Sequence, residues 1–335
     1  MITAIEVILL TWVFLFAVAS LYIRDLLGAV LSFGAYSFLM CLVWTGMGAV
    51  DVAFTEAAVG AGVSSVFFLA MLYNTSRKST PFSKSTLLNI WGGLAAILMG
   101  VVLINSMSDF PSWGDPESPV NANVSSYYIT HTLADTAVPN IVTAVLGDYR
   151  GFDTMFETVV VFLALVVVMA ILRPAKDEKT EVPARKKRHD GVILRVAARI
   201  LVPFMQLFAL YVVCHGHYSP GGGFQGGVIL GASLILLSLS YDLAVMPKFL
   251  TEKAMMILAA LGALIFAGIG LVPVIIGGQF LNYSLWSEII PGLDSVMARY
   301  HAILGVEIGV ALTVMCGMYG IYAYLVSDGR LERGL

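Results

Sequence analysis

The stretch CHGHYSPGGGFQGG, residues 214–227, decides how the second half of this chain folds. It joins two hydrophobic runs, residues 194–213 and 228–243, and about 20 apolar residues cross roughly 30 Å of hydrocarbon. Pro220 fixes φ and lacks an N–H donor, whereas glycines permit positive φ and close approach of the backbone. The sequence therefore predicts a helix that stops, a tight turn, and a helix that re-enters the membrane. Polar backbone at such a turn must be buried in protein or hydrated.

Two other interpretations of this stretch fail. Residues 221–226 match G-x-G-x-x-G, but the dinucleotide fingerprint needs a preceding strand in a βαβ unit, and here a membrane helix precedes it. His215 and His217 lie near Cys214, yet a structural zinc site needs about four ligands, and no second pair is visible. We therefore expect no cofactor and no metal site. The stretch is interpreted as a tight interfacial turn whose polar ends face water or a neighbouring protein of a complex.

The composition is that of a membrane protein. Of the 335 residues, 59% are hydrophobic and 12% charged, and the mean hydropathy is +0.87, whereas soluble domains carry roughly 25% charged residues. A net charge of −3 gives no indication of a nucleic-acid partner. The three cysteines are far apart and form no CxxC or haem motif, so we expect no disulfide framework and no electron transfer through the chain. The prediction is a non-enzymatic, all-α polytopic transmembrane helix bundle.

We expect about nine spans, and the distribution of Lys and Arg sets their orientation. Basic residues cluster after the third, fifth, seventh and last spans, whereas the opposite loops carry only Arg150 and Arg299. The positive-inside rule then places the N-terminus outside and the C-terminus inside. The predicted spans are residues 3–22, 26–47, 50–73, 87–106, 154–172, 194–214, 224–244, 254–276 and 297–326.

Two segments between the spans differ from the rest. The outer segment 107–153 begins with Asp, Pro and Glu residues typical of an irregular loop. Residues 127–146 are mildly apolar but interrupted by His131, Asp135 and Pro139, which favours a re-entrant or interfacial helix over a span. Residues 173–190 form a charged linker, expected on the cytoplasmic side, that divides the chain into two halves.

The chain resembles known families in three places. H-x-H-x-x-P-G-G-G-F-Q-G-G between two membrane helices resembles the B subunit of Mrp-type multisubunit cation/proton antiporters, a module that also occurs in membrane-bound hydrogenases related to complex I. Residues 51–62, DVAFTEAAVGAG, resemble the D-type subunit of these hydrogenases and the C-terminal part of the Mrp A subunit. Residues 139–154, PNIVTAVLGDYRGFDT, resemble the adjoining E-type segment.

These resemblances imply a fusion of D-, E- and B-type segments. We expect a D-type module at residues 1–106, an E-type segment with an outer loop and one span at 107–172, the linker at 173–190, and a B-type module at 191–335. The structural turn that carries the B-type resemblance comprises His215, His217, Pro220, Gly221, Gly222, Gly223, Phe224, Gln225, Gly226 and Gly227.

Four carboxylates are candidates for an ion or proton path. An ionisable group inside a membrane helix is costly and is a functional hypothesis by default. Glu56 lies about 7 Å deeper than Asp51, which we expect to be solvated, and small residues after Glu56 permit a local bulge. Glu307 lies in the last span, where Arg299 is about 80° away around the helix, so direct pairing is not expected. Glu157 begins the fifth span, which favours a funnel or interface role. The alternative for Glu56 and Glu307 is a structural hydrogen bond to a neighbouring helix.

The resemblance implies a membrane subunit of an Mrp-type sodium(cation)/proton antiporter in the cytoplasmic membrane of a prokaryote. Its partners would be the A, C and D subunits, the small E-, F- and G-type subunits, the bilayer, Na⁺ and H⁺. No Lys lies in the middle of a span, which favours an accessory role over that of the main pump. Two alternatives remain open: an ion-translocating arm of a hydrogenase or other complex I-like enzyme, and a purely structural scaffold.

Overall fold

The computed structural model describes residues 4–79, 86–112, 114–173, 192–327, 329 and 331. Within these ranges nine helices are long and apolar enough to cross a membrane, and no strand is formed, which confirms the predicted all-α class and number of spans. The spans are α1 (Ala4–Tyr22), α2 (Leu26–Gly46), α3 (Val50–Glu56) continued by π-helix η1 (Ala57–Ser64) and α4 (Ser65–Asn74), α5 (Thr86–Ser106), α8 (Gly151–Leu172), α9 (Val192–His215), α10 (Gly223–Tyr241), α11 (Glu252–Ile275) and α13 (Ser295–Ser327).

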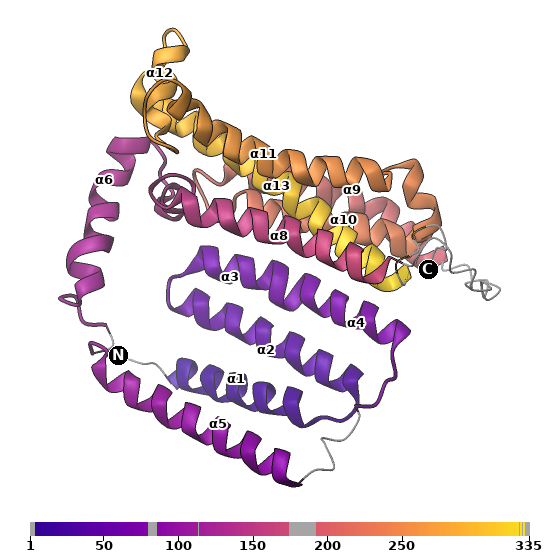
Figure 1. The fold of residues 1–335 in the computed structure, drawn as a ribbon. Coiled ribbons are helices and arrows are strands. Elements are labelled where there is room, and N and C mark those ends of the chain that lie inside the picture. The colour runs from indigo at the N-terminus through magenta and orange to yellow at the C-terminus, as the bar shows by residue number, and fades with distance from the viewer. Residues whose placement is uncertain are drawn as a thin grey trace.

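Helix α13 is the centre of the fold. It packs against α8, α10 and α11 and also against α4 of the front half (Figure 1). Small residues allow these close approaches. A Cβ on Gly309 would stand 2.6 Å from the carbonyl oxygen of Gly262 in α11, and one on Gly320 would meet Leu165 of α8. Of the 18-residue apolar window of α13, 72% is buried.

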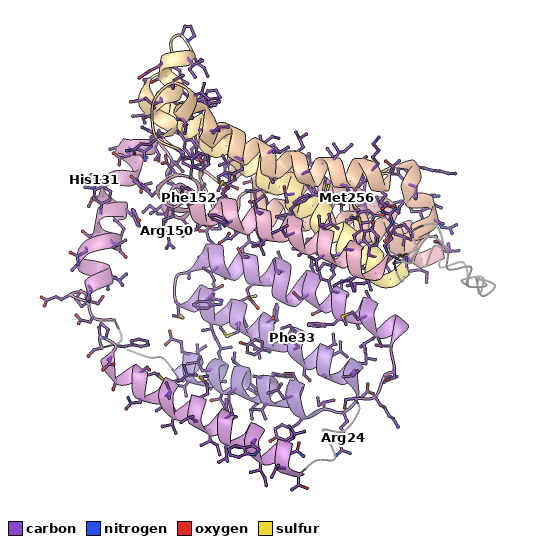
Figure 2. The ribbon with its side chains drawn as sticks, in the orientation of Figure 1. Arg24, Phe33, His131, Arg150, Phe152 and Met256 are labelled. Carbon is purple, nitrogen blue, oxygen red and sulfur yellow. The ribbon has the colours of Figure 1, made fainter. Side chains whose placement is uncertain are left out.

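The front half is a more open layer. Helices α1, α2 and α3–α4 lie side by side (Figure 1), and Figure 2 shows where Phe33 lies on α2. Phe33 meets Phe68 of α4 edge to face, with 5.6 Å between ring centroids. Arg77 after α4 donates to Asp25, the N-cap of α2, at 2.8 Å. Helix α5 has no buried residue, and its side chains stand apart from the crowded α8–α13 layer (Figure 2).

Most of the short elements lie at the end of the molecule where α6 and α12 lie (Figure 1), whereas η5 (Leu243–Lys248) joins α10 to α11 at the opposite end. The predicted interfacial helix at 127–146 is two pieces, because the C-cap of α6, Ala137, has φ 54° and Pro139 follows. The remaining elements are η2 (Met107–Asp109), η3 (Val120–Ser125), α6 (Ser126–Thr136), α7 (Ile141–Ala144), η4 (Val145–Tyr149), η5 (Leu243–Lys248), η6 (Tyr283–Leu285) and α12 (Trp286–Ile289).

Helix boundaries match the expectation within about three residues. The largest shifts are three residues: α10 ends at Tyr241, and α8 begins at Gly151, because an acidic residue such as Asp153 is favourable in the first turn of a helix. Apart from Arg173, the predicted linker 173–190 lies outside the described residues.

Candidate functional site

The glycine-rich turn links α9 to α10 through backbone that few other residues could form. Gly221 and Gly222 have φ of 155° and 127°, and the N–H of Gly222 donates to the carbonyl of Val212 at 3.2 Å. The prediction of a tight turn is confirmed. Much of the turn is buried within the protein: Asn140 and Thr143 bond to His217 and Gly216, while Gly221 lies against Val212 and Gly222 and Gly223 lie against Glu307.

Glu307 lies directly behind this turn. Glu307 is 9% exposed, and the N–H of Gly223 donates to its carboxylate oxygen Oε2. A Cβ on Gly222 would stand 2.8 Å from the same oxygen. Gly223 is the first residue of α10, and the N-terminus of a helix attracts negative charge through its free N–H groups. The fold therefore places a carboxylate of α13 at the positive end of α10.

Asp51 meets the same turn from the other side. Its Oδ1 accepts a hydrogen bond from the N–H of Gly221 at 3.3 Å and from Nδ2 of Asn140 at 3.4 Å. Asp51 is half-buried, so its carboxyl is less exposed than expected, with the turn and Asn140 bonded to one of its oxygens. Amides two residues apart in one turn thus face carboxylates from the front and back halves.

Gln225 adds a further link between the halves. Its side-chain amide donates to the hydroxyl of Thr55 at 2.8 Å, one turn along from Asp51. Gly226 packs on Val213 of α9, and Gly227 packs on α13, so α10 approaches both neighbours closely. Phe224 is half-buried against the core, and Pro220 is exposed.

Asn140 was missed by the sequence analysis as a site residue. Its Oδ1 caps α7 by accepting from the N–H of Val142 at 3.0 Å, and its Nδ2 donates to the carbonyls of Gly216 at 3.1 Å and Ser219 at 3.0 Å. Its own N–H donates to the carbonyl of His217 at 2.8 Å. An Asn after Pro and before an apolar run is an N-cap signal that could have indicated this residue.

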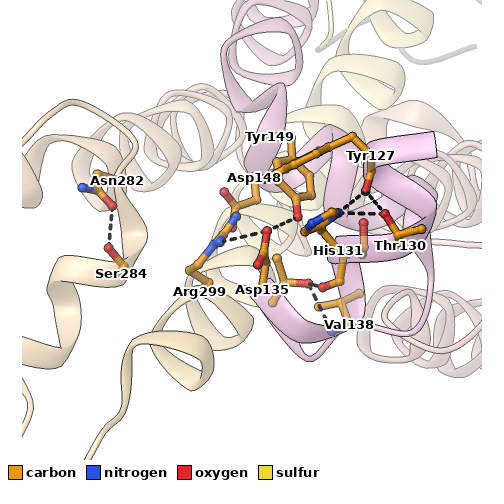
Figure 3. Close-up of polar contacts among 12 residues, drawn as sticks. Tyr127, Thr130, His131, Asp135, Val138, Asp148, Tyr149, Asn282, Ser284 and Arg299 are labelled. Atoms are coloured by element: carbon orange, nitrogen blue, oxygen red, sulfur yellow. Dashed lines mark hydrogen bonds and ion pairs between the residues drawn. The ribbon is translucent and has the colours of Figure 1, made fainter. Parts of the chain in front are cut away.

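A second polar cluster fixes the E-type segment to α13 (Figure 3). Arg299 donates from Nε to Asp148 at 2.6 Å and lies 3.9 Å from Asp135, whose Oδ2 accepts from the Tyr149 hydroxyl at 2.7 Å. Burial raises the pKa of Asp148, and the Arg299 guanidinium opposes this shift. Burial and Asp135 raise the pKa of Tyr149 to about 12. As expected, Arg299 is not placed to pair with Glu307.

Glu56 occupies a different setting. It is the last residue of α3, and η1 begins at the next residue, which confirms the predicted bulge. Its half-buried carboxyl lies over Gly60, and a Cβ at Gly60 would also stand 2.8 Å from the Ser37 hydroxyl of α2. π-Helical turns are rare and occur frequently at functional sites.

The remaining candidates lie apart from this pair of carboxylates. Glu157 is exposed in the second turn of α8. His215 stacks between Tyr211 and Tyr218.

His217 is 2% exposed, and its ring lies edge-on to that of Tyr300, with 4.4 Å between ring centroids. Burial and the neighbouring His301 lower the pKa of His217 to about 4. Among the described residues no group of three His, Cys, Asp or Glu side chains could hold a metal ion.

Comparison with known proteins places these features in families. Residues 193–320 match a domain related to the MnhB subunit of a Na⁺/H⁺ antiporter, residues 11–77 match the D subunit of MBH, and residues 93–188 match the E subunit of MBH. A putative antiporter protein of Staphylococcus aureus, the mnhB2 subunit, is 30% identical over 138 residues, which cover 97% of that protein and 40% of this chain. The chain belongs to the MnhB-related family. It is a fused membrane subunit with D-, E- and B-type segments.

Two of the similar proteins are longer than this chain, and a third is matched over almost its whole length. The A/B subunit of a probable K⁺/H⁺ antiporter of Rhizobium meliloti is 22% identical over 64% of this chain, which spans 24% of that protein. The solved Mrp complex from Dietzia sp. DQ12-45-1b matches with a TM-score of 0.70 and 27% identity, over 94% of this chain and 34% of the other. The archaeal membrane-bound sulfane sulfur reductase matches with a TM-score of 0.50 and 29% identity, over 70% of this chain and 98% of the other.

The MnhB-related match covers the turn and both helices that it joins, together with Glu307. Asp51 and Glu56 lie in the D-type match, and Asn140 lies in the E-type match. The contacts around the turn are therefore made where all three segments of the fusion meet.

Proposed function

We propose that this MnhB-related chain acts within an Mrp-type cation/proton antiporter and contributes part of the path for protons or sodium ions. The observation that carries the proposal is the pairing of Glu307 and Asp51 with the amides of one buried turn. A carboxylate buried near a second carboxylate is costly to keep charged, which suits a group that takes up and releases protons. Glu56 is proposed as a further member of the path.

The partners and orientation belong to the same proposal. The A, C, D and small E-, F- and G-type subunits would cover apolar surface left by the front half, such as helix α5. The turn would face the outside of a prokaryotic cytoplasmic membrane, with the N-terminus outside and the C-terminus inside. We also propose that the D-type, E-type, linker and B-type segments end at residues 106, 172, 190 and 335. The first two of these boundaries are the last residues of α5 and α8.

Replacement of Glu307 by Gln tests this function. The carboxamide preserves shape but cannot release a proton, so sodium-dependent proton flux should fall by on the order of 100-fold, the low end of what a proton-transfer group contributes. Flux would be measured in membrane vesicles that contain the full complex and divided by the amount of assembled complex.

The matched control is Glu288→Gln, because Glu288 is an exposed carboxyl of α12 at the same end of the molecule. This variant should keep the flux of the unmodified complex. An assembled Glu307→Gln complex with undiminished flux would contradict the proposed path and favour a purely structural role.

A membrane arm of a complex I-like enzyme is the second candidate. The similarity to the membrane-bound sulfane sulfur reductase over 70% of this chain favours it. Purification of the chain from its native membrane separates the two functions: co-isolation of iron–sulfur proteins would support a redox-driven complex, and co-isolation of antiporter proteins alone would support the antiporter.

A further inference from the structure

The side-chain amide of Asn140 faces more acceptors than it can serve. Nδ2 lies 3.0 Å from the carbonyl of Ser219, 3.1 Å from that of Gly216 and 3.4 Å from Oδ1 of Asp51. An Asn amide has only two hydrogens, so three acceptors must share them. The three acceptors therefore compete for the same donor.

Of the three acceptors, only the Asp51 carboxyl can change its charge; the other two are backbone carbonyls. A hydrogen bond to an ionised carboxylate is roughly twice as strong as one to a neutral acceptor. Ionised Asp51 thus draws the amide towards itself, and protonated Asp51 leaves it to the two carbonyls. The carbonyl of Gly216 keeps a second donor, the Thr143 hydroxyl at 2.7 Å, so the loss falls mainly on Ser219.

We propose that Asn140 is a positioning residue. It couples the charge of Asp51 to the hydrogen bonds that fix the glycine-rich turn, and through the turn to Glu307. The inference deepens the proposed function, on which it rests. Gly221 and Gly223 lie immediately beyond Ser219 and Pro220 and present their N–H groups to the two carboxylates. Weakening of the bond between Asn140 and the Ser219 carbonyl is therefore transmitted over four residues to Gly223, whose N–H donates to Glu307. By reciprocity, the state of Glu307 acts back on Asp51.

Several ionisable groups lie around the turn, and the structure shows which of them interact with Asp51. Glu307 of α13 interacts with Asp51 electrostatically, while the N–H of Gly221 and the amide of Asn140 donate to it. The same helix also carries Glu56, and the turn carries His215 and His217, of which His217 is neutral above its lowered pKa of about 4. Arg299 belongs to the separate cluster with Asp148, and Cys41 of α2 interacts with Glu56.

A cysteine reporter at Ser219 tests the coupling without measuring transport. Ser219→Cys would be introduced together with Cys214→Ser, because Cys214 is exposed. The rate of maleimide labelling would be followed against pH in the purified complex. Glu288→Cys, an exposed reporter, would correct for ionisation of the thiol itself.

We expect the corrected labelling rate at Ser219 to show one roughly fivefold increase with pH, the factor that corresponds to about one hydrogen bond. Asp51→Asn should abolish this step. Asn140→Ser keeps an oxygen that can cap α7 but lacks the amide, so labelling should be fast at every pH without a step. Thr143→Val removes a bond to the same turn without touching Asp51 and should keep the step.

Three results would overturn the inference: no step with the original Asp51, a step that survives Asp51→Asn, or a step lost equally in Thr143→Val. Asp51→Asn preserves the shape of the site, so the test does not depend on whether Asn140→Ser folds. Because labelling is independent of flux, failure here leaves the Glu307→Gln experiment to decide the proposed function separately.

Discussion

Glu307 and Glu56 are both carboxyls in apolar helices, yet the two halves of the molecule treat them differently. In the back half, α13 is 72% buried over its apolar window, and Glu307 meets the N-terminus of α10. In the front half, the corresponding window of the helix that carries Glu56 is 17% buried, and the carboxyl lies over Gly60 at the start of a π-helix. The comparison indicates that a backbone N–H fixes Glu307 within a closely packed core, whereas Glu56 lies in a loosely packed layer where neighbouring helices bury it less.

The strongest test of this contrast is one substitution made in both halves. Gly222→Val places a branched side chain at φ 127° and 2.8 Å from Glu307, so the assembled complex should be almost absent. The measurement is the amount of complex recovered by purification through another protein of the complex.

The matched variant is Gly92→Val in α5, where the added Cβ would meet no other part of the described structure within 4 Å beyond its own helix backbone. Valine forms helix more readily than glycine, by under about 1 kcal/mol, so the complex should be recovered in the normal amount. Equal losses in both variants would remove the distinction between a closed back half and an open front half.

A second test addresses the carboxyl of the front half. Glu56→Gln should assemble normally but reduce flux per assembled complex by on the order of tenfold, because an open setting lets water replace part of a proton relay. Glu56→Asp should retain more flux than Glu56→Gln. Undiminished flux in the Gln variant would remove Glu56 from the path and leave Glu307 and Asp51 as its carboxyl members.

A third and smaller effect concerns acid stability in the back half. The pKa of His217 is lowered from 6.5 to about 4 in the folded chain, so the unfolded state binds more protons between these values. The stability contributed by neutral His217 is therefore complete above pH 6.5 and is lost as the pH falls towards 4, by about 3 kcal/mol in total.

His217→Gln should weaken this dependence of the melting temperature on pH, measured on the purified complex between pH 7 and pH 4. His131→Gln is the control, because His131 is an exposed histidine of α6. If His217→Gln left the pH dependence unchanged, burial of the imidazole would not be the cause of acid sensitivity.

The sequence predicted most of the fold but little of the site. Hydrophobic runs and the Pro220–Gly227 stretch predicted nine spans and a tight turn, since length and composition largely determine membrane helices. Glu56 and Glu307 stood out because charged residues are rare in spans. Nothing local distinguished them, because the partner of Glu307 is the N–H of Gly223, 84 residues away.

The contacts that the sequence could not predict are between backbone and side chains of different segments. Asn140 reaches Gly216 and Ser219 through tertiary packing alone, and a local pattern indicates only its role as an N-cap. Asp51 was expected in water because its position in the span is terminal, and the 137–149 segment covers that end. Arg299 was correctly separated from Glu307 by helical geometry, whereas its partner Asp148 could not be identified without the fold.

The central position of α13 has a consequence for how the chain is made. It is the last of the described spans to leave the ribosome, yet it supplies the packing surface for α8, α10 and α11 and, at Ala70, for α4. At about 5–20 residues per second, the front spans wait roughly 13–50 s for this helix to be synthesised. During that time the helix that carries Asp51 and Glu56 has α2 beside it but lacks α13, so lipid or another protein covers the face that α13 later contacts.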